Sequence, residues 1–589
     1  MTARKLILTA DECTWPQNYK DPVLFLGEGC KLYSRKEVWQ QLDAEVAPYH
    51  WDDRQKFFKD YLYLENLYEK ILLDLSNKLN HIHSVDYSIR YWRILIGPWL
   101  ILFISTLFDR WFMLKQTIDK KDITECNIIE RDPMSVVPND MSHFLNIYVD
   151  DDWNEAIYGQ LLEMYWNDMV KIKKIKKLSI NNTHKDNKNP GVKPAFKIYN
   201  KKCWISLFNK LLPKDDSYFF ISTSLSLKID FKLQIKLGQF PKLWQRLPAP
   251  LIKLDIEQRQ WRLDDKSKDT SFEDVARRFI PYHVPTVYLE GFKELEKATI
   301  HSGWPKRPKA IFTSNAFYSN DVFKKWAAEK TETGTTLVIG QHGGHYGMTP
   351  FNFEEVHQID IADKYLSWGW SDNLRPKILP VGNLKSHNRK VRCDLNGTAL
   401  MVELCMSRYS FHIYAHPQAR QYLDYLDDQK KFLEILPHKL RKQVLLRLYP
   451  SDYGLDQKNR WKDKMPEVQI DPGNQSILNL IKKSRLYIST YNATTYLESL
   501  YWNVPTLIFW NPKHWELKEN AKPYFELLKS VGIFHDTPEG AAQQMINVWD
   551  DIDLWWNSKE VQNARLKFCK QYSRDNNRLV SHLEKILMG

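Results

Sequence analysis

The sequence predicts an α/β fold in which two parallel sheets face a cleft, with a helical N-terminal elaboration. Two features lead to this prediction. The chain has 589 residues, more than one hydrophobic core supports, so at least two domains are expected. A strand–helix–strand pattern occurs between residues 309 and 340, and a second series of strands and helices begins at Ala399. Units of this kind form parallel sheets.

The N-terminal domain is expected to span residues 1–390. It begins with two short apolar runs typical of strands, Leu6–Leu8 and Val23–Leu26. From about residue 36 to residue 170, apolar residues recur at spacings of three and four. That periodicity predicts helices, so the elaboration is expected to be helical.

The strands of both sheets are recognisable as apolar runs that end in polar loops. In the N-terminal domain, strands at Lys309–Asn315 and Thr335–Gly340 flank a helix from Asp321 to Lys330. In a C-terminal domain at residues 391–560, the predicted strands are Ala399–Leu404, Val444–Leu448, Leu486–Ser489 and Thr506–Phe509, and the predicted helices lie around 417–436, 476–484 and 493–502. Residues 561–589 are expected to form a C-terminal helix that packs back on the N-terminal domain. Because open α/β sheets bind ligands beyond the carboxyl ends of their strands, chemistry is expected in the loops there.

The positive charge of the chain is concentrated in one segment. The formal net charge is +12, and the stretch from Lys171 to Lys202 holds 11 Lys opposed only by Asp186. We expect a Lys-rich insertion at about 171–215 with a loop in its middle. A solvated insertion and a patch that contacts anionic lipid remain equal alternatives, since each Lys near such a surface adds about 1 kcal/mol. Nucleic-acid binding is not expected, because the basic residues lack interleaved aromatics and a binding motif.

Composition favours a soluble, cytoplasmic protein. Hydrophobic residues make up 43% and charged residues 26%, which is ordinary for a globular domain. The seven Cys are scattered and never form a C-x-x-C pair, which argues against a disulfide framework and a structural zinc site. The uncharged stretch Ile94–Leu107 is too short to cross a bilayer, and Gly97-Pro98 would break a spanning helix near its start. We therefore expect a buried helix there, in a protein that is cytoplasmic or peripheral on the inner face of the membrane.

The strongest local motif is Ser489-Thr-Tyr-Asn-Ala-Thr-Thr-Tyr-Leu-Glu498, which follows a strand and opens a helix. Hydroxyls and free N–H groups at a helix N-terminus, aided by the helix dipole, can hold a phosphate. The residues expected to bind substrate here are Ser489, Thr490, Asn492, Thr494, Thr495 and Glu498, the last through a ribose or sugar hydroxyl. The alternative is an ordinary helix cap formed by Asn492.

A second motif, Gln341-His-Gly-Gly-His-Tyr-Gly347, follows the strand that ends at Gly340. Glycines let the backbone approach a ligand closely, and a His can act as an acid or a base near neutral pH. We expect His342 to be catalytic, with Gln341, Gly343, Gly344 and His345 binding substrate. A purely structural glycine turn is the alternative, and the two His lack a third ligand at zinc-site spacing.

Three further residues are candidates of lower rank. Arg447 lies inside an apolar strand, so it needs a phosphate or a carboxylate partner. Asn315 follows a strand and is expected to face the cleft. Asp321 is a second choice of catalytic base or nucleophile, or a cap of its helix. No metal site is expected, because the Asp150–Asp152 triplet lacks the Gly and Glu of a calcium loop.

At these residues the chain resembles a family of transferases from O-antigen and other surface-polysaccharide clusters, first named from a leptospiral example. The resemblance covers nearly the whole length. It is strongest over Ala310–Asp321, Gly334–Gly347, Leu446–Gly454 and Ser489–Trp556, including Asn492-Ala-Thr-Thr-Tyr-Leu-Glu and Pro523-Tyr-Phe-Glu-Leu-Leu. It implies a GT-B fold of two Rossmann-like domains. More distantly, the chain is similar to bacterial Kdo-transferases and sialyltransferases that use CMP-activated sugars, where hydroxyl residues like Ser489 and Thr490 hold the CMP phosphate.

Together, motifs and resemblance predict a metal-independent glycosyltransferase without a cofactor. Its expected partners are a nucleotide-sugar donor, such as a CMP-activated ulosonic acid, and a lipid-linked or oligosaccharide acceptor of a growing surface polysaccharide or O-antigen. A UDP- or GDP-sugar transferase, or an epimerase-like enzyme of the same fold, is one alternative. A non-catalytic, membrane-associated scaffold of a polysaccharide assembly complex is another.

Overall fold

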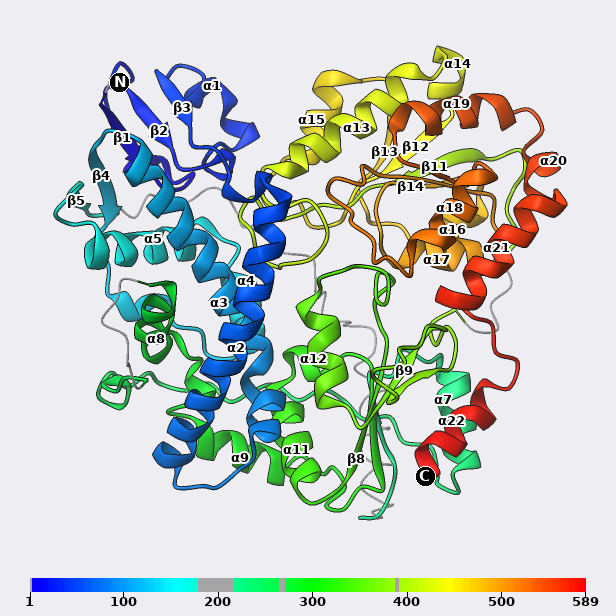
Figure 1. The fold of residues 1–589 in the computed structure, drawn as a ribbon, viewed down its shortest axis with the longest axis horizontal. Helices are drawn as coiled ribbons and strands as arrows, with labels where there is room; N and C mark the ends of the chain where they lie inside the picture. Colours follow the sequence, from blue (N-terminus) through cyan, green and yellow to red (C-terminus); the bar gives the residue numbers. More distant parts are fainter. Residues whose placement is uncertain (1–2, 178–214, 264–270, 387–390) are drawn as a thin grey trace.

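The computed structural model describes residues 3–177, 215–263, 271–386 and 391–589. They form three parallel β-sheets with helices around them (Figure 1). We name these sheets A, B and C in chain order. In Figure 1 sheet A lies at the upper left, sheet C at the upper right and sheet B below. The α/β prediction is confirmed, but the chain has one sheet more than expected.

Sheet A occupies the region predicted to be a helical elaboration. Its strands are β1 (Arg4–Ile7), β2 (Val23–Phe25), β3 (Ala44–Val46), β4 (Ile123–Ile129) and β5 (Lys171–Ile175), in the order β3-β2-β1-β4-β5. The first two strands were predicted. Helices fill most of the stretch 36–170 that was predicted to be helical, but β3 and β4 also lie within it. The edge strand β3 is exposed and has almost no apolar signal. The predicted Lys-rich insertion begins as strand β5, and residues 178–214 of it lie outside the described residues.

Sheet B holds the predicted strand–helix–strand unit. Its strands are β6 (Phe219–Ile221), β7 (Ala310–Thr313), β8 (Thr336–Gly340), β9 (Lys364–Ser367) and β10 (Ile378–Pro380). Their order, β10-β9-β8-β7-β6, follows the sequence without reversal. The core strand β7 is fully buried along its length.

Sheet C is a complete Rossmann-type sheet. Its strands are β11 (Thr398–Val402), β12 (Val444–Arg447), β13 (Gln469–Asp471), β14 (Ser484–Ser489), β15 (Thr506–Phe509) and β16 (Phe534–His535). The order β13-β12-β11-β14-β15-β16 reverses between β11 and β14. A ligand is expected at such a switch point, beyond the carboxyl ends of these two strands.

The helices cover the sheets in three groups. With sheet A lie α1 (Lys36–Trp39), α2 (Arg54–His83), α3 (Ile89–Lys120), α4 (Met141–Ile147) and α5 (Asp151–Tyr165). With sheet B lie α7 (Leu227–Lys236), α9 (Phe292–Ile300), α10 (Ala316–Ser319), α11 (Asp321–Glu332) and α12 (Phe353–Ile361). Helix α8 (Phe272–His283) packs on α3 instead, on the side of sheet A (Figure 1). With sheet C lie α13 (Gln421–Ile435), α14 (His438–Arg441), α15 (Gln457–Lys464), α16 (Ile477–Lys482), α17 (Thr494–Tyr501), α18 (Lys522–Ser530), α19 (Pro538–Val548), α20 (Ile552–Trp556) and α21 (Lys559–Tyr572). The last helix, α22 (Leu579–Met588), follows a crossing to the sheet B side.

The long apolar helix α3 is a core element, as predicted. It is the one helix among the described residues with the length and composition to span a membrane, and 94% of its most apolar 18-residue window is buried. Its buried Asp109 accepts hydrogen bonds from Tyr49 and His50, both at 3.0 Å. The expected break at Gly97-Pro98 was wrong, since Pro98 lies inside the helix. The close packing around the helix offsets the one backbone hydrogen bond that Pro98 removes.

We call each sheet together with the helices around it a unit. The C-terminal segment returns to the sheet B unit. Helix α21 packs against α17 and α18, and α22 packs against α7 (Figure 1). Lys236 on α7 contacts Glu584 on α22 at 2.6 Å. At the crossing, Asn383 bonds to Ser573, so the two connections between these units lie side by side.

Glu403 follows β11 and generates a prediction about stability. Its side chain is buried, one oxygen accepts from Trp461 Nε1 at 3.1 Å, and burial raises its pKa to about 8. The unfolded chain loses this proton near pH 4.5, so the folded state is progressively disfavoured as the pH rises from about 4.5 to 8. Glu403→Gln removes this penalty. The stability gained by the variant should grow by about 1.4 kcal/mol per pH unit in that window, measured by denaturant unfolding at several pH values. A gain that does not change with pH would contradict the assignment.

Candidate functional site

Three loops from the carboxyl ends of strands meet between sheets B and C. They follow β8 (341–352), β11 (403–420) and β14 (490–493). A Cβ added to Gly344 would lie 2.4 Å from the Ala493 carbonyl oxygen and 2.6 Å from Thr494 Cα. The glycine turn and the start of α17 are therefore in direct contact. The structure thus brings together the two motifs that the sequence singled out.

The side chain of Gln341 stabilises the glycine turn through hydrogen bonds. Its Nε2 donates to the Gly343 carbonyl at 2.7 Å, and its Oε1 accepts from Trp368 N and Trp370 Nε1, both at 2.9 Å. The side chain is fully buried. These contacts give Gln341 a structural role, and its expected contact with substrate stays a prediction.

His342 lies beside a carboxylate that the sequence did not indicate. Its side chain is 26% exposed, and its Nε2 lies 3.3 Å from Oε1 of Glu354 in the first turn of α12. The other oxygen of Glu354 accepts from the Tyr414 hydroxyl at 2.6 Å. The other ring nitrogen of His342, Nδ1, is buried without a partner among the described residues. This arrangement of base and orienting carboxylate matches what general-base catalysis requires. A sequence signal for Glu354 existed: Asn352, two residues before it, caps α12.

His345 lies in a cluster of neutral histidines from both sides of the interface. Its ring centroid is 5.5 Å from that of Tyr414, which stacks on His412 at 5.0 Å and meets His416 edge-on at 5.6 Å. Burial lowers the pKa of His345 and of His412 to about 3, and that of His416 to about 4. At neutral pH these rings each offer one N–H and one lone pair. They suit hydroxyl groups better than phosphate, which only accepts hydrogen bonds.

The start of α17 offers backbone N–H groups to a ligand. Ala493 occupies the N-cap position and makes no side-chain cap bond. Thr494 and Thr495 are half-buried there, and Thr495 Oγ1 accepts from the Tyr487 hydroxyl at 2.6 Å. Asn492 does not cap the helix. Its Oδ1 accepts from Tyr496, and its buried Nδ2 has no partner within the described part of the chain.

The hydroxyls of Ser489 and Thr490 do not point to a phosphate site. Both residues are buried, Ser489 Oγ donates to the Tyr491 carbonyl at 3.2 Å, and Thr490 Oγ1 donates to the Val402 carbonyl at 2.8 Å. The bond from Thr490 ties β14 to β11 at the switch point. The predicted phosphate contacts of these two hydroxyls are therefore wrong in this conformation, because they stabilise the sheet edge.

Arg447 and Glu498 also have structural partners. Arg447 Nη1 bonds to Asp471 at 2.6 Å and Nη2 to the Gly473 carbonyl at 3.2 Å. This is the structural ion pair that the sequence left open. Glu498 is buried and accepts from Ser386 Oγ at 3.4 Å in the connection between the units. The expected role of Glu498 at a ribose or sugar is not supported by this position.

Asp321 lies where α11 packs against the sheet A unit. Its carboxylate accepts from Met141 N at 2.9 Å and from the Tyr288 hydroxyl, and lies 2.7 Å from Lys324 Nζ. Only 2% of the residue is exposed, so the catalytic role predicted for Asp321 is wrong: the carboxylate is enclosed and fully partnered. It does not cap its helix either, since Asn320 does. Asn315 is half-buried at the end of β7 and precedes α10.

No group of three or more potential ligand side chains is placed to hold a metal ion in the described segments. The cleft residues offer imidazoles, hydroxyls and backbone N–H groups instead. This donor set does not resemble a carboxylate site for Mg²⁺.

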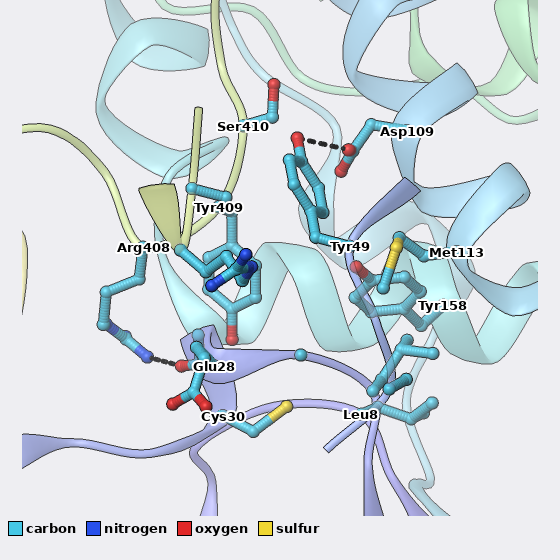
Figure 2. A pocket seen from close by; sticks show the side chains of 16 residues that line it. Leu8, Glu28, Cys30, Tyr49, Asp109, Met113, Tyr158, Arg408, Tyr409 and Ser410 are labelled. Carbon is cyan, nitrogen blue, oxygen red and sulfur yellow. Dashed lines mark hydrogen bonds between the residues drawn. The ribbon is translucent and has the colours of Figure 1, made fainter. Parts of the chain in front are cut away.

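A cavity of about 30 Å³ lies at the carboxyl edge of sheet A, under the β11 loop (Figure 2). Tyr49 bonds to Asp109 beside it, and Arg408, Tyr409 and Ser410 cover it. The volume suits about two water molecules. In this conformation the cavity does not accommodate a sugar or a nucleotide.

The fold defines the chain as an α/β protein in which the carboxyl edges of two parallel sheets meet at one interface, which is the arrangement that a GT-B fold has. Comparison with protein families identifies it further: the chain belongs to the LIC12162 family of transferases, whose model matches residues 4–587. No curated protein matches the sequence.

Several solved structures are similar over much of the chain. The wall teichoic acid polymerase TagF is 12% identical, with a TM-score of 0.29, and the match covers 66% of this chain and 94% of that one. MurG of Acinetobacter baumannii is 10% identical (TM-score 0.28, 50% and 76% covered), and the O-GlcNAc transferase of Thermobaculum terrenum is 12% identical (TM-score 0.31, 64% and 68% covered).

The contact at Gly344 leads to a prediction. Gly344→Ala would place a methyl group against the backbone of Ala493, so the two loops must separate. We expect unfolding stability to fall by about 1–3 kcal/mol, measured by chemical denaturation. Gly27→Ala is the control, because a Cβ there meets no atom within 4 Å. Equal stability of the two variants would show that the loops are not in contact in solution.

Proposed function

We propose that this transferase is a glycosyltransferase that moves a sugar from a nucleotide donor to a growing surface polysaccharide, without a metal ion. The observation that carries the proposal is the pairing of His342 with Glu354, opposite the open N-terminus of α17. The glycine turn that carries His342 contacts the start of α17 through Gly344, so a base and a helix end suited to an anion belong to one interface. A direct displacement at the anomeric carbon, which inverts configuration, uses a base on the acceptor and a stabilised leaving group.

The donor phosphate is assigned to the start of α17. The N–H groups of the first turn lack a side-chain cap, and the helix dipole favours an anion there. Thr494 adds a hydroxyl at the same point. This assignment keeps the predicted location on the C-terminal unit but relies on the backbone of residues 494–496 rather than on Ser489 and Thr490.

The acceptor is assigned to the side of His342. Nδ1 of His342 takes the proton of an acceptor hydroxyl as its oxygen bonds to the anomeric carbon. The bond from that carbon to the phosphate oxygen breaks, and its electron pair leaves with the nucleotide. The imidazolium then returns its proton to solvent. Neutral His345 and His412 are suited to bind sugar hydroxyls beside it.

The donor class is a finer proposal. The similarity of the sequence to CMP-sugar enzymes favours a CMP-activated ulosonic acid, and an O-antigen intermediate as acceptor. A UDP- or GDP-sugar enzyme would use the same geometry. A scaffold bound to anionic lipid through the Lys-rich segment at 171–215 would leave the unpartnered nitrogens of the cleft without a role. The proposed location is the inner face of the cytoplasmic membrane.

The first test is a thermal-shift screen with CMP, UDP, GDP and dTDP in EDTA. We expect stabilisation by one pyrimidine nucleotide, CMP first, because the α17 site binds phosphate without a cation. Thr494→Pro removes a backbone N–H and a hydroxyl at the first helical position, where Pro is tolerated, and should reduce the shift. No shift with any nucleotide at millimolar concentration would favour the scaffold.

A second test addresses the base. His342→Ala should lower kcat by about a hundredfold or more if the ring removes the acceptor proton, measured as sugar transfer with the donor that the screen identifies. His301→Ala, an exposed His outside the site, is the control. Unchanged turnover in His342→Ala would remove this residue from catalysis.

Transfer is also expected to persist in EDTA. The proposed site neutralises the leaving phosphate with N–H groups and a helix dipole, so chelation should change kcat by less than about twofold. Activity should be measured before and after dialysis against EDTA, with re-addition of Mg²⁺ and Mn²⁺. Loss on dialysis with recovery on re-addition would contradict metal independence.

A further inference from the structure

The carboxylate beside His342 is held from both units of the protein. Glu354 lies on α12 of the sheet B unit, with only 13% of its side chain exposed. Its Oε1 lies 3.3 Å from His342, and its Oε2 accepts from Tyr414 at 2.6 Å. Tyr414 belongs to the β11 loop of the sheet C unit. A single carboxylate therefore connects the proposed base to the opposite side of the interface.

Backbone contacts fix the positions of both Glu354 and Tyr414. Asn352 accepts from the N–H groups of Glu354 and Glu355 and so sets the start of α12. The same Asn352 forms an antiparallel bridge with Tyr414, and Ala415 N donates to the Phe351 carbonyl at 3.3 Å. Tyr414 therefore reaches Glu354 through a backbone contact between the units, and its position depends on the two units being closed.

We propose that Glu354 and Tyr414 are positioning residues that fix which nitrogen of His342 acts as the base, and that they do so only when the two units are in contact. The proposal rests on the function proposed above. Nε2 lies 3.3 Å from Oε1 of Glu354, an oxygen that also accepts from Gln358 Nε2 at 3.4 Å. A carboxylate at this distance favours the tautomer with the proton on Nε2 and the lone pair on Nδ1. The Tyr414 hydroxyl holds the second oxygen and keeps the carboxylate turned toward the ring.

The chemistry follows from this tautomer. Nδ1 is buried and has no partner in the described residues. With the proton on Nε2, its lone pair is the one that can receive the acceptor proton once an acceptor hydroxyl reaches it. As Nδ1 takes that proton the ring becomes a cation, and the neighbouring carboxylate stabilises it without itself becoming protonated. The same division of roles operates in hydrolytic triads, where loss of the carboxylate leaves the wrong tautomer.

A neighbouring contact provides a matched control. Lys518 of the sheet C unit lies 3.0 Å from Glu355, the residue after Glu354, and its N–H donates to the Met348 carbonyl. It joins the same two units at the same helix turn but is not placed against His342. Lys518→Met therefore weakens the interface without changing the carboxylate beside the base.

The test is the ¹⁵N spectrum of the histidine rings in the free protein, recorded at alkaline pH, where an exposed ring is neutral. The His342 signal is assigned by its absence in His342→Asn. In the wild type and in Lys518→Met we expect the tautomer with the proton on Nε2. In Glu354→Gln and, to a smaller degree, in Tyr414→Phe we expect a mixture of tautomers.

Kinetics with the identified donor give a second readout. Glu354→Gln should lower kcat on the order of a hundredfold with KM changed less than about threefold, since it misplaces a general base without touching the donor site. Tyr414→Phe should lower kcat by about tenfold, and Glu354→Asp should recover part of the loss. Lys518→Met should stay within about twofold of the wild type.

The outcomes separate the two proposals. An unchanged His342 tautomer in both Glu354→Gln and Tyr414→Phe would overturn the positioning role, whatever the activity. If Glu354→Gln fails to fold, Tyr414→Phe alone decides, because it removes one hydroxyl and keeps the ring stack with His412. A shifted tautomer in a protein that transfers no sugar would leave the positioning intact and sink the proposed function instead.

Discussion

The β11 loop, residues 403–420, is the constraint on which the arrangement of the three sheets depends. It begins at the switch point of sheet C and contacts both other units. Arg408 pairs with Asp151 of the sheet A unit, and the Ser410 carbonyl accepts from the buried Arg110 on α3. Tyr414 then reaches Glu354. Because Arg110 and Arg408 are buried charges, leaving either without its partners would cost several kcal/mol. The loop is therefore fixed where it contacts them, and the cleft on its other side is fixed with it.

Sheet A is joined to the rest of the molecule through these contacts. The β11 loop covers part of its carboxyl edge and leaves a cavity of about 30 Å³ there, and a second cavity of about 210 Å³ lies at the ends of β4 and β5. Further ion pairs join the sheet A unit to the sheet C unit, among them Arg54–Glu516 at 2.7 Å and Arg420–Asp52 at 2.7 Å. Helix α3 meanwhile packs on α11 and α12 of the sheet B unit. The sheet A unit thus contacts both the sheet B unit and the sheet C unit, and these contacts restrict how far those two units can separate.

The sequence predicted sheets B and C because their strands are buried runs bounded by turns. Thr506–Phe509 was predicted with its observed bounds. Sheet A was not recognised as a sheet, because β5 reads Lys-Ile-Lys-Lys-Ile, the composition of a solvated edge. The sequence also did not show which way the side chains at the end of a strand point. Thr490 directly follows β14, and the direction of its hydroxyl depends on Val402, in a strand almost ninety residues earlier. Glu354 was missed for the same reason, since its role comes from a contact with Tyr414, sixty residues further on.

The distribution of charge in the cleft bears on how the proposed site would hold a phosphate. Arg447, the cation that the sequence singled out for a phosphate, is paired with Asp471. Lys518 contacts Glu355. The histidines His345, His412 and His416 are neutral because burial lowers the pKa of each to about 3 or 4. A donor phosphate at this interface therefore meets no free side-chain cation among these residues, and the uncapped N–H groups of α17 are the positive end left to receive it. An anion bound there would be held by fixed dipoles, which need no rearrangement as charge develops on the leaving group.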